Sequence, residues 1–101
     1  MTKAARAKGG LAEKQAAKEL REQGYLVETP IRSRWGREDF WSCWDIMAIK
    51  KDELRFIQIS TKPLYDRGVE AKKKYADFPK GKCWTKEFWQ LKEGGWRIWE
   101  L

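Results

Sequence analysis

The chain has 101 residues, which is enough for one domain with a single hydrophobic core but too few for a second. Its 22 Lys and Arg residues against 15 Asp and Glu residues give a net charge of +7, which favours an anionic partner such as nucleic acid. No apolar run reaches the about 18 residues that cross a membrane, and the basic start lacks the apolar stretch of a signal peptide. We therefore expect a cytoplasmic protein without a membrane partner.

The composition also limits the chemistry. Histidine is absent, and Cys43 and Cys83 do not form a CxxC pair. This excludes a Cys-His nucleophile pair and the usual zinc sites, so two free thiols are expected in a reducing compartment. Any metal would be held by oxygen atoms, which select Mg²⁺ or Mn²⁺.

The first residues, 1–8, mix basic side chains with alanine and offer nothing to pack against a core. We expect them to form a flexible basic arm in which Lys3, Arg6 and Lys8 contact phosphates. Residues 9–101 are then expected to form the single domain.

A helix is predicted from Gly9 to Gln23, because strong helix formers dominate this run and Gly24 stands where a helix commonly ends. Further along, alternating apolar and polar residues between Pro, Gly and charged turns predict strands and a weaker helical segment. The expected strands are 25–29, 42–50, 54–61, 82–92 and 96–101, and the helical segment is 64–78. This order indicates an α/β or α+β domain with a mixed sheet of about five strands flanked by helices.

The segment 31–41 has no period and mixes arginines, aromatic residues and a glycine, so we interpret it as a functional loop. Its candidates for contact with nucleic acid are Arg32, Arg34, Trp35 and Arg37. Arginines suit phosphates, and aromatic rings can stack on unpaired bases. Packing in the core or in a dimer interface is the alternative for the aromatic residues.

Glu13 lies within the apolar arc of the first predicted helix. At about 100° per residue, it projects among Ala12, Ala16, Ala17 and Leu20, whereas most charged residues of the helix project to the other side. A glutamate that faces a core is costly unless it is paired with a cation or protonated. An exposed helical residue is the alternative, but no cation stands four positions after Glu13. We interpret Glu13 as a functional carboxylate.

The stretch from Asp45 to Lys62 carries polar residues inside two strand-like runs, where polar side chains are depleted. The period of two places Gln58, Ser60 and Lys62 on one face of the second strand. A divalent cation would reconcile Asp45 with a second inward carboxylate, and Gln58 would add a carbonyl oxygen. Ser60 offers a hydroxyl, and Lys62 offers a cation that steadies a phosphate or a hydroxide. An edge strand running into solvent is the alternative for Ser60 and Lys62.

These motifs resemble the PD-(D/E)XK nuclease superfamily, and most closely the archaeal-type Holliday junction resolvases. The family opens with a helix of the form KGxxAExxxxxxLxxxGY, matched here by Lys8-Gly9, Ala12-Glu13, Leu20 and Gly24-Tyr25. It continues with a strand bearing a metal-binding aspartate, here WDIMAI, and with an E-x-K strand thirteen residues beyond that aspartate, where this chain has QIS. The family often ends in a strand resembling GWRFIEV, and this chain ends GWRIWEL, so the similarity spans nearly the whole chain.

The resemblance implies a restriction-endonuclease-like fold, Mg²⁺ or Mn²⁺ as the cofactor, and a homodimer that matches the two-fold symmetry of a DNA junction. It implies that Glu13 is the helix carboxylate, Asp45 the central metal ligand and Gln58 the replacement for the second acidic ligand. The backbone carbonyl of Ile59 would join the metal shell. Ser60 stands where the family has its catalytic lysine, and we expect Lys62, one pleat further along the strand, to supply the ammonium group.

The sequence therefore predicts a metal-dependent endonuclease that hydrolyses phosphodiester bonds in branched DNA, as in recombination and repair, without a small-molecule cofactor. The replaced lysine and second acid leave one alternative open, a nuclease fold that has lost catalysis and binds nucleic acid or a protein. A mismatch-type or restriction-like nuclease on the same fold is a further alternative. The tryptophans expected in the dimer interface are Trp84, Trp89, Trp96 and Trp99.

Overall fold

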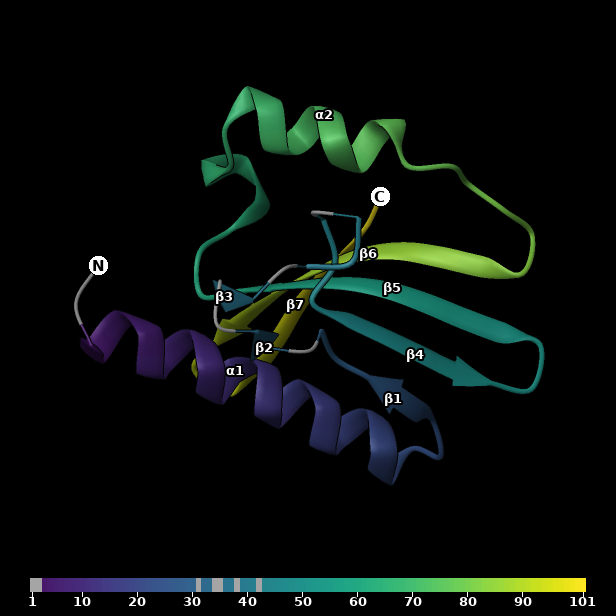
Figure 1. The fold of residues 1–101 in the computed structure, drawn as a ribbon, viewed down its shortest axis with the longest axis horizontal. Coiled ribbons are helices and arrows are strands. Elements are labelled where there is room, and N and C mark those ends of the chain that lie inside the picture. Colours follow the sequence, from purple (N-terminus) through teal and green to yellow (C-terminus); the bar gives the residue numbers. More distant parts are fainter. Residues whose placement is uncertain (1–2, 31, 34–35, 38, 42) are drawn as a thin grey trace.

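The computed structural model describes residues 3–30, 32–33, 36–37, 39–41 and 43–101, with the backbone alone described for residues 3–9, 32–33 and 36–37. Within these ranges the chain forms an α+β fold in which helix α1 (Lys3–Glu22) covers one face of a mixed sheet and helix α2 (Val69–Asp77) lies on the other face (Figure 1). None of the described helices is long and apolar enough to cross a membrane.

The sheet has five strands in the order β1-β4-β5-β6-β7. Their bounds are Leu26–Glu28 (β1), Ile46–Lys50 (β4), Glu53–Ser60 (β5), Trp84–Lys92 (β6) and Gly95–Glu100 (β7). Neighbouring strands are antiparallel except β5 and β6, which are parallel and joined by a crossover through α2. Two shorter strands, β2 (Arg32–Ser33) and β3 (Gly36–Arg37), pair separately within the predicted loop. All five strands predicted from the sequence are confirmed.

Helix α1 begins at Lys3, whereas the sequence predicted a start at Gly9 and a flexible arm over residues 1–8. The helix starts earlier because Ala, Lys and Arg are strong helix formers, while each glycine inside a helix costs only about 1 kcal/mol. The predicted end is confirmed, because Gly24 has φ 95° and the Tyr25 N–H donates to the Leu20 carbonyl at 3.0 Å. The chain then turns directly into β1.

The face of α1 that meets the sheet is made of small side chains. Ala12, Ala16 and Leu20 have no solvent exposure and pack against Ile57 of β5. Alanine at these positions lets the helix approach the strands closely, which is why the apolar arc predicted from the sequence is buried. Trp89 of β6 belongs to this cluster with 3% exposure. It is therefore a core residue and not part of an exposed interface, contrary to the prediction.

The opposite face of the sheet carries an aromatic cluster beneath α2. Trp44 and Phe88 are fully buried in it, and the ring of Trp44 lies 5.7 Å from that of Tyr75 on α2. Phe56 lies 4.9 Å from Phe78, at the end of the same helix. Bulky rings on this face give a short helix a large buried area.

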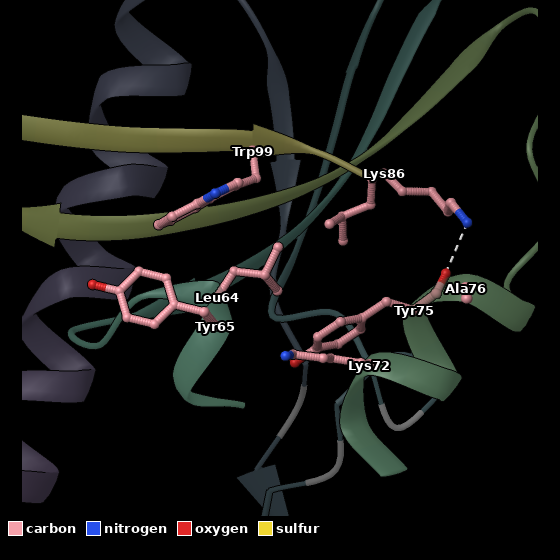
Figure 2. A pocket seen from close by; sticks show the side chains of 8 residues that line it. Leu64, Tyr65, Lys72, Tyr75, Ala76, Lys86 and Trp99 are labelled. Atoms are coloured by element: carbon pink, nitrogen blue, oxygen red, sulfur yellow. Dashed lines mark hydrogen bonds between the residues drawn. The ribbon is translucent and has the colours of Figure 1, made fainter. Parts of the chain in front are cut away.

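The predicted helical segment 64–78 divides in two, because η1 (Leu64–Asp66) ends before Gly68 and α2 starts after it. The carboxyl end of α2 is held by a buried lysine. Lys86 of β6 donates from Nζ to the carbonyl of Tyr75 at 2.7 Å and to that of Phe78 at 2.8 Å, and Figure 2 shows the first of these bonds. A cation at this end satisfies carbonyls that the helix leaves unpaired.

Candidate functional site

Asp45 immediately precedes β4, where its backbone N–H donates to the Ile57 carbonyl at 2.8 Å and holds it against β5. Its carboxylate Oδ2 accepts hydrogen bonds from the Ile59 N–H and from Gln58 Nε2, each at 2.8 Å. Asp45 is 4% exposed and Gln58 is 9% exposed. The structure thus brings together Asp45, Gln58 and Ile59, which the sequence analysis assigned to one metal shell.

Burial and neighbouring acids raise the pKa of the Asp45 carboxyl. Desolvation is the largest cause, the negative charge of Asp39 is the next, and together with weaker causes they bring the pKa to about 8. The Ile59 N–H acts in the opposite direction, while the charge of Glu13 and a hydrogen bond with Asp39 add to the increase. A carboxyl in this position takes up a proton or a cation near neutral pH.

Glu13 lies on α1, half-buried, and lines a cleft of about 270 Å³ together with Thr29 and Pro30. Its charge is one of the causes that raise the pKa of Asp45, so the helix carries this carboxylate toward the site as the helical projection indicated. Asp45 and Gln58 do not line this cleft. Glu13 therefore approaches the site from the α1 side of the sheet.

The amide of Gln58 occupies the space between two of the predicted ligand atoms. Its Nε2 donates to Asp45 Oδ2 at 2.8 Å and to the Ile59 carbonyl at 3.3 Å. In this orientation an N–H group points at both oxygen atoms, and a nitrogen that donates hydrogen bonds cannot be a metal ligand. Rotating the amide by half a turn presents Oε1 instead, and only then do the residues fit a hard cation.

The prediction that Lys62 shares a strand face with Gln58 is wrong. Strand β5 ends at Ser60, and the buried Ser60 Oγ accepts the Lys62 N–H at 2.9 Å. This bond closes a turn that bends the chain toward Pro63, so Lys62 lies after the strand with an exposed side chain. The Ser60 hydroxyl is engaged in the turn and offers no cation.

The residues predicted to contact nucleic acid have side chains that the structure does not describe. The side chains of Lys3, Arg6, Lys8, Arg32 and Arg37, and all of Arg34 and Trp35, lie outside the described part of the structure. Their roles stay predictions.

Two residues that the sequence analysis did not select bear on the site: Asp39, whose charge raises the pKa of Asp45, and Arg67, which lies over the strand next to Gln58. Asp39 could have been found, because it is an acid placed among arginines and aromatic residues in the loop before Asp45. Arg67 gives no such signal, since it lies in an irregular segment between η1 and Gly68. Its guanidinium carbon is 5.3 Å from the ring centre of Phe88, which pairs in register with Gln58.

A separate cavity of about 430 Å³ lies between η1, α2 and the end of β7 (Figure 2). Tyr65, Tyr75 and Trp99 form much of its wall, and Leu64 projects into its middle. None of the predicted site residues lines this cavity.

Within the described ranges, no three Cys, Asp or Glu side chains are arranged to hold a metal by themselves. A metal shell here depends on the amide of Gln58 and the carbonyl of Ile59 as much as on carboxylates. No family model matches the chain, and no curated protein is similar to it. The site is therefore interpreted from its own geometry and from the motifs of the sequence.

Proposed function

We propose that the protein is a metal-dependent DNA endonuclease with a restriction-endonuclease-like fold that acts on branched DNA, as Holliday junction resolvases do. The observation that carries the proposal is the buried Asp45 carboxyl, held on β5 by Ile59 and Gln58 with the charges of Asp39 and Glu13 nearby. Acidic groups crowded inside a fold are costly, and a divalent cation offsets that cost. The α+β architecture supports the proposal, because the resemblance implies a mixed sheet of about five strands flanked by helices.

In this proposal Asp45, the Ile59 carbonyl and a rotated Gln58 would hold Mg²⁺ or Mn²⁺, and Glu13 would complete the shell directly or through water. The bound cation would polarise a phosphodiester and supply hydroxide at neutral pH. Asp45 would act as a ligand in its deprotonated form, and the hydrogen bond from the Ile59 N–H would hold the orientation of its carboxylate. The net charge of +7 attracts DNA, and a homodimer would present two such sites to a two-fold symmetric junction.

A second candidate is a nucleic-acid-binding module on the same fold. The observation that favours it is the N–H group of Gln58 between Asp45 Oδ2 and the Ile59 carbonyl, which satisfies both oxygens without a metal. The position of Lys62 outside the strand also favours it, because that residue was expected to replace the catalytic lysine. In this candidate Asp45 stays protonated and the basic surface alone binds DNA.

The test uses a labelled four-way junction, a mismatched duplex, a matched duplex and single strands, each with Mg²⁺, Mn²⁺ or EDTA. We expect metal-dependent, symmetric nicking of the junction that Asp45→Asn abolishes. The matched control is Asp52→Asn in the exposed turn between β4 and β5, which should cut at the normal rate. Tight junction binding without cutting in either metal would establish the binding module instead. Cutting of the mismatched or matched duplex would show that the substrate is a duplex and not a branched DNA.

A further inference from the structure

Arg67 is a cation over the strand next to Gln58, and one of its donors has no acceptor among the described residues. Its guanidinium carbon lies 5.3 Å from the centre of the Phe88 ring. Its Nε is buried, and no atom among the described residues accepts a hydrogen bond from it. A buried donor without an acceptor costs free energy, so the fold holds this guanidinium over Phe88 at a cost, which favours a role for it other than stability.

The register of the sheet relates Arg67 to Gln58 through the ring of Phe88. Phe88 of β6 is the direct partner of Gln58 on β5, and Gln58 donates to Asp45. Phe88 and Phe56 belong to the same cluster on the α2 face, and the period of two puts Gln58 on that face with Phe56. The ring that the guanidinium covers therefore belongs to the strand next to Gln58, on the face of the sheet to which Gln58 points.

The charges of Arg67 and of the acids act on a common side chain, Tyr75. Burial raises the pKa of Tyr75 on α2, the charge of Arg67 lowers it, and the charges of Asp45 and Asp39 raise it. Tyr75 is thus within reach of both the basic group and the acidic groups.

A second arginine repeats the arrangement on the next strand. The guanidinium carbon of Arg97 lies 4.4 Å from the ring centre of Trp99, and Trp99 is the register partner of Phe88. Arg97 is exposed. Two arginines stacked on two neighbouring rings are held in fixed directions, and a planar guanidinium with several donors is suited to phosphate oxygens.

We propose that Arg67 binds a phosphate of the nucleic acid beside Asp45 and that Arg97 binds a neighbouring phosphate of the same strand. Arg67 then supplies the positive charge that neither Ser60 nor Lys62 brings to the site. Because a guanidinium keeps its proton at all ordinary pH values, Arg67 binds and stabilises negative charge but does not transfer protons. This inference rests on the proposed function for its substrate, and a readout without catalysis tests it separately.

The first experiment measures stability and binding of Arg67→Met, in which an apolar chain of similar length keeps the contact with Phe88. Without DNA the variant should melt at the same temperature as the parent or higher, because the buried Nε without an acceptor is gone. In EDTA it should bind a labelled four-way junction about tenfold more weakly or worse. A lower melting temperature with unchanged junction binding would show that Arg67 is only structural and would overturn the proposal.

Three further variants define the position of the phosphates. Arg97→Ala should weaken junction binding and reduce its salt dependence, while Lys82→Ala, which removes one exposed charge elsewhere, should change binding much less. Arg67→Lys should restore only part of the affinity, since an ammonium group cannot make paired contacts. Equal losses of junction affinity in Arg67→Met and Lys82→Ala would show that Arg67 contributes only through the net charge of the protein. This result would also overturn the proposal.

The last readout separates this inference from the proposed function. If the parent protein cuts the junction, Arg67→Met should lower kcat more than it raises KM, and added guanidinium ion should recover part of the rate. An unchanged kcat would overturn the assignment of Arg67 to the reacting phosphate. If the parent binds but does not cut, the endonuclease proposal fails, and the binding measurements alone decide whether Arg67 contacts phosphate.

Discussion

The amide nitrogen of Gln58 lies 2.8 Å from Asp45 Oδ2, and the same nitrogen donates to the Ile59 carbonyl at 3.3 Å. The neutral amide of Gln58 therefore donates hydrogen bonds to the same two oxygen atoms that a metal ion would otherwise bind. The orientation of this amide decides whether the site is closed by the protein itself or open to a metal.

Gln58→Glu should convert the site into one that requires a metal. A carboxylate so close to Asp45 repels it and removes the N–H donor, which should lower the free energy of unfolding in EDTA by about 1–3 kcal/mol. Millimolar Mn²⁺ should then raise the melting temperature of the variant well beyond its effect on the parent. Differential scanning fluorimetry over a Mn²⁺ titration measures this.

The matched control is Gln90→Glu, which makes the same change on the neighbouring strand at the register partner of Ser60. It should show no greater response to Mn²⁺ than the parent does. Equal responses in the two variants would mean that Asp45 does not take part in binding the cation.

Asp45→Asn should change how stability depends on pH. The folded-state pKa of about 8 is above the unfolded value of about 3.9, so this carboxyl stabilises the fold fully below the lower value. That stability is lost as the pH rises through the folded value. The asparagine side chain does not titrate. The free energy of unfolding of the variant, relative to that of the parent, should therefore increase by on the order of a few kcal/mol between pH 5 and pH 9.

Urea unfolding in EDTA at several pH values measures that difference. Asp52→Asn, in the exposed turn, should give a curve parallel to that of the parent. Parallel curves for Asp45→Asn as well would show that the Asp45 carboxyl ionises normally in the folded protein.

The ion pair between Arg55 and Glu87 predicts a large loss when one partner is removed. Arg55 contacts the Glu87 carboxylate through Nε at 2.8 Å and through a terminal nitrogen at 2.5 Å, with side-chain exposures of 16% and 7%. Arg55→Met leaves a buried carboxylate without its cation and should cost about 3–5 kcal/mol in chemical denaturation. The double variant Arg55→Met/Glu87→Leu should recover most of that loss, and a double variant as unstable as the single one would contradict this account.

Lys86→Met should loosen the carboxyl end of α2. The substitution removes the two hydrogen bonds to the Tyr75 and Phe78 carbonyls while keeping most of the buried chain. We expect a loss of about 1–3 kcal/mol and faster amide hydrogen exchange in α2 than in α1. Lys74→Met, an exposed change on α2 itself, is the control and should leave exchange nearly unchanged.

The sheet could be predicted from the sequence because its strands obey a local rule. Runs such as the one around Phe56 and Ile57 alternate between two buried faces, and Gly24 ends α1 where its freedom to adopt positive φ is needed. The pairing of Asp45 with Gln58 also followed from spacing, since Asp45 immediately precedes β4 and Gln58 lies on β5, the two strands of one hairpin.

The position of Lys62 could not be predicted, because a single hydrogen bond from its own N–H to Ser60 Oγ ends the alternation. Arg67 could not be predicted either, since only the crossover between β5 and β6 brings it over Phe88. The positions of Lys62 and Arg67 both depend on where the chain leaves the sheet. The alternation of residues along a strand does not predict that point. The buried place of Trp89 depends on which face of β6 meets α1, and that too is a tertiary property.

The parallel pairing of β5 with β6 has a consequence for synthesis of the chain. On the ribosome, β1, β4 and β5 can pair as soon as they emerge, because each antiparallel contact is local in sequence. Until Trp84 and the residues after it follow, β5 is an edge strand whose hydrogen-bonding groups face outward. Nascent chains that stall before β6 should therefore associate with one another, and the completed protein avoids this by pairing both sides of β5, which then lies at the centre of the sheet.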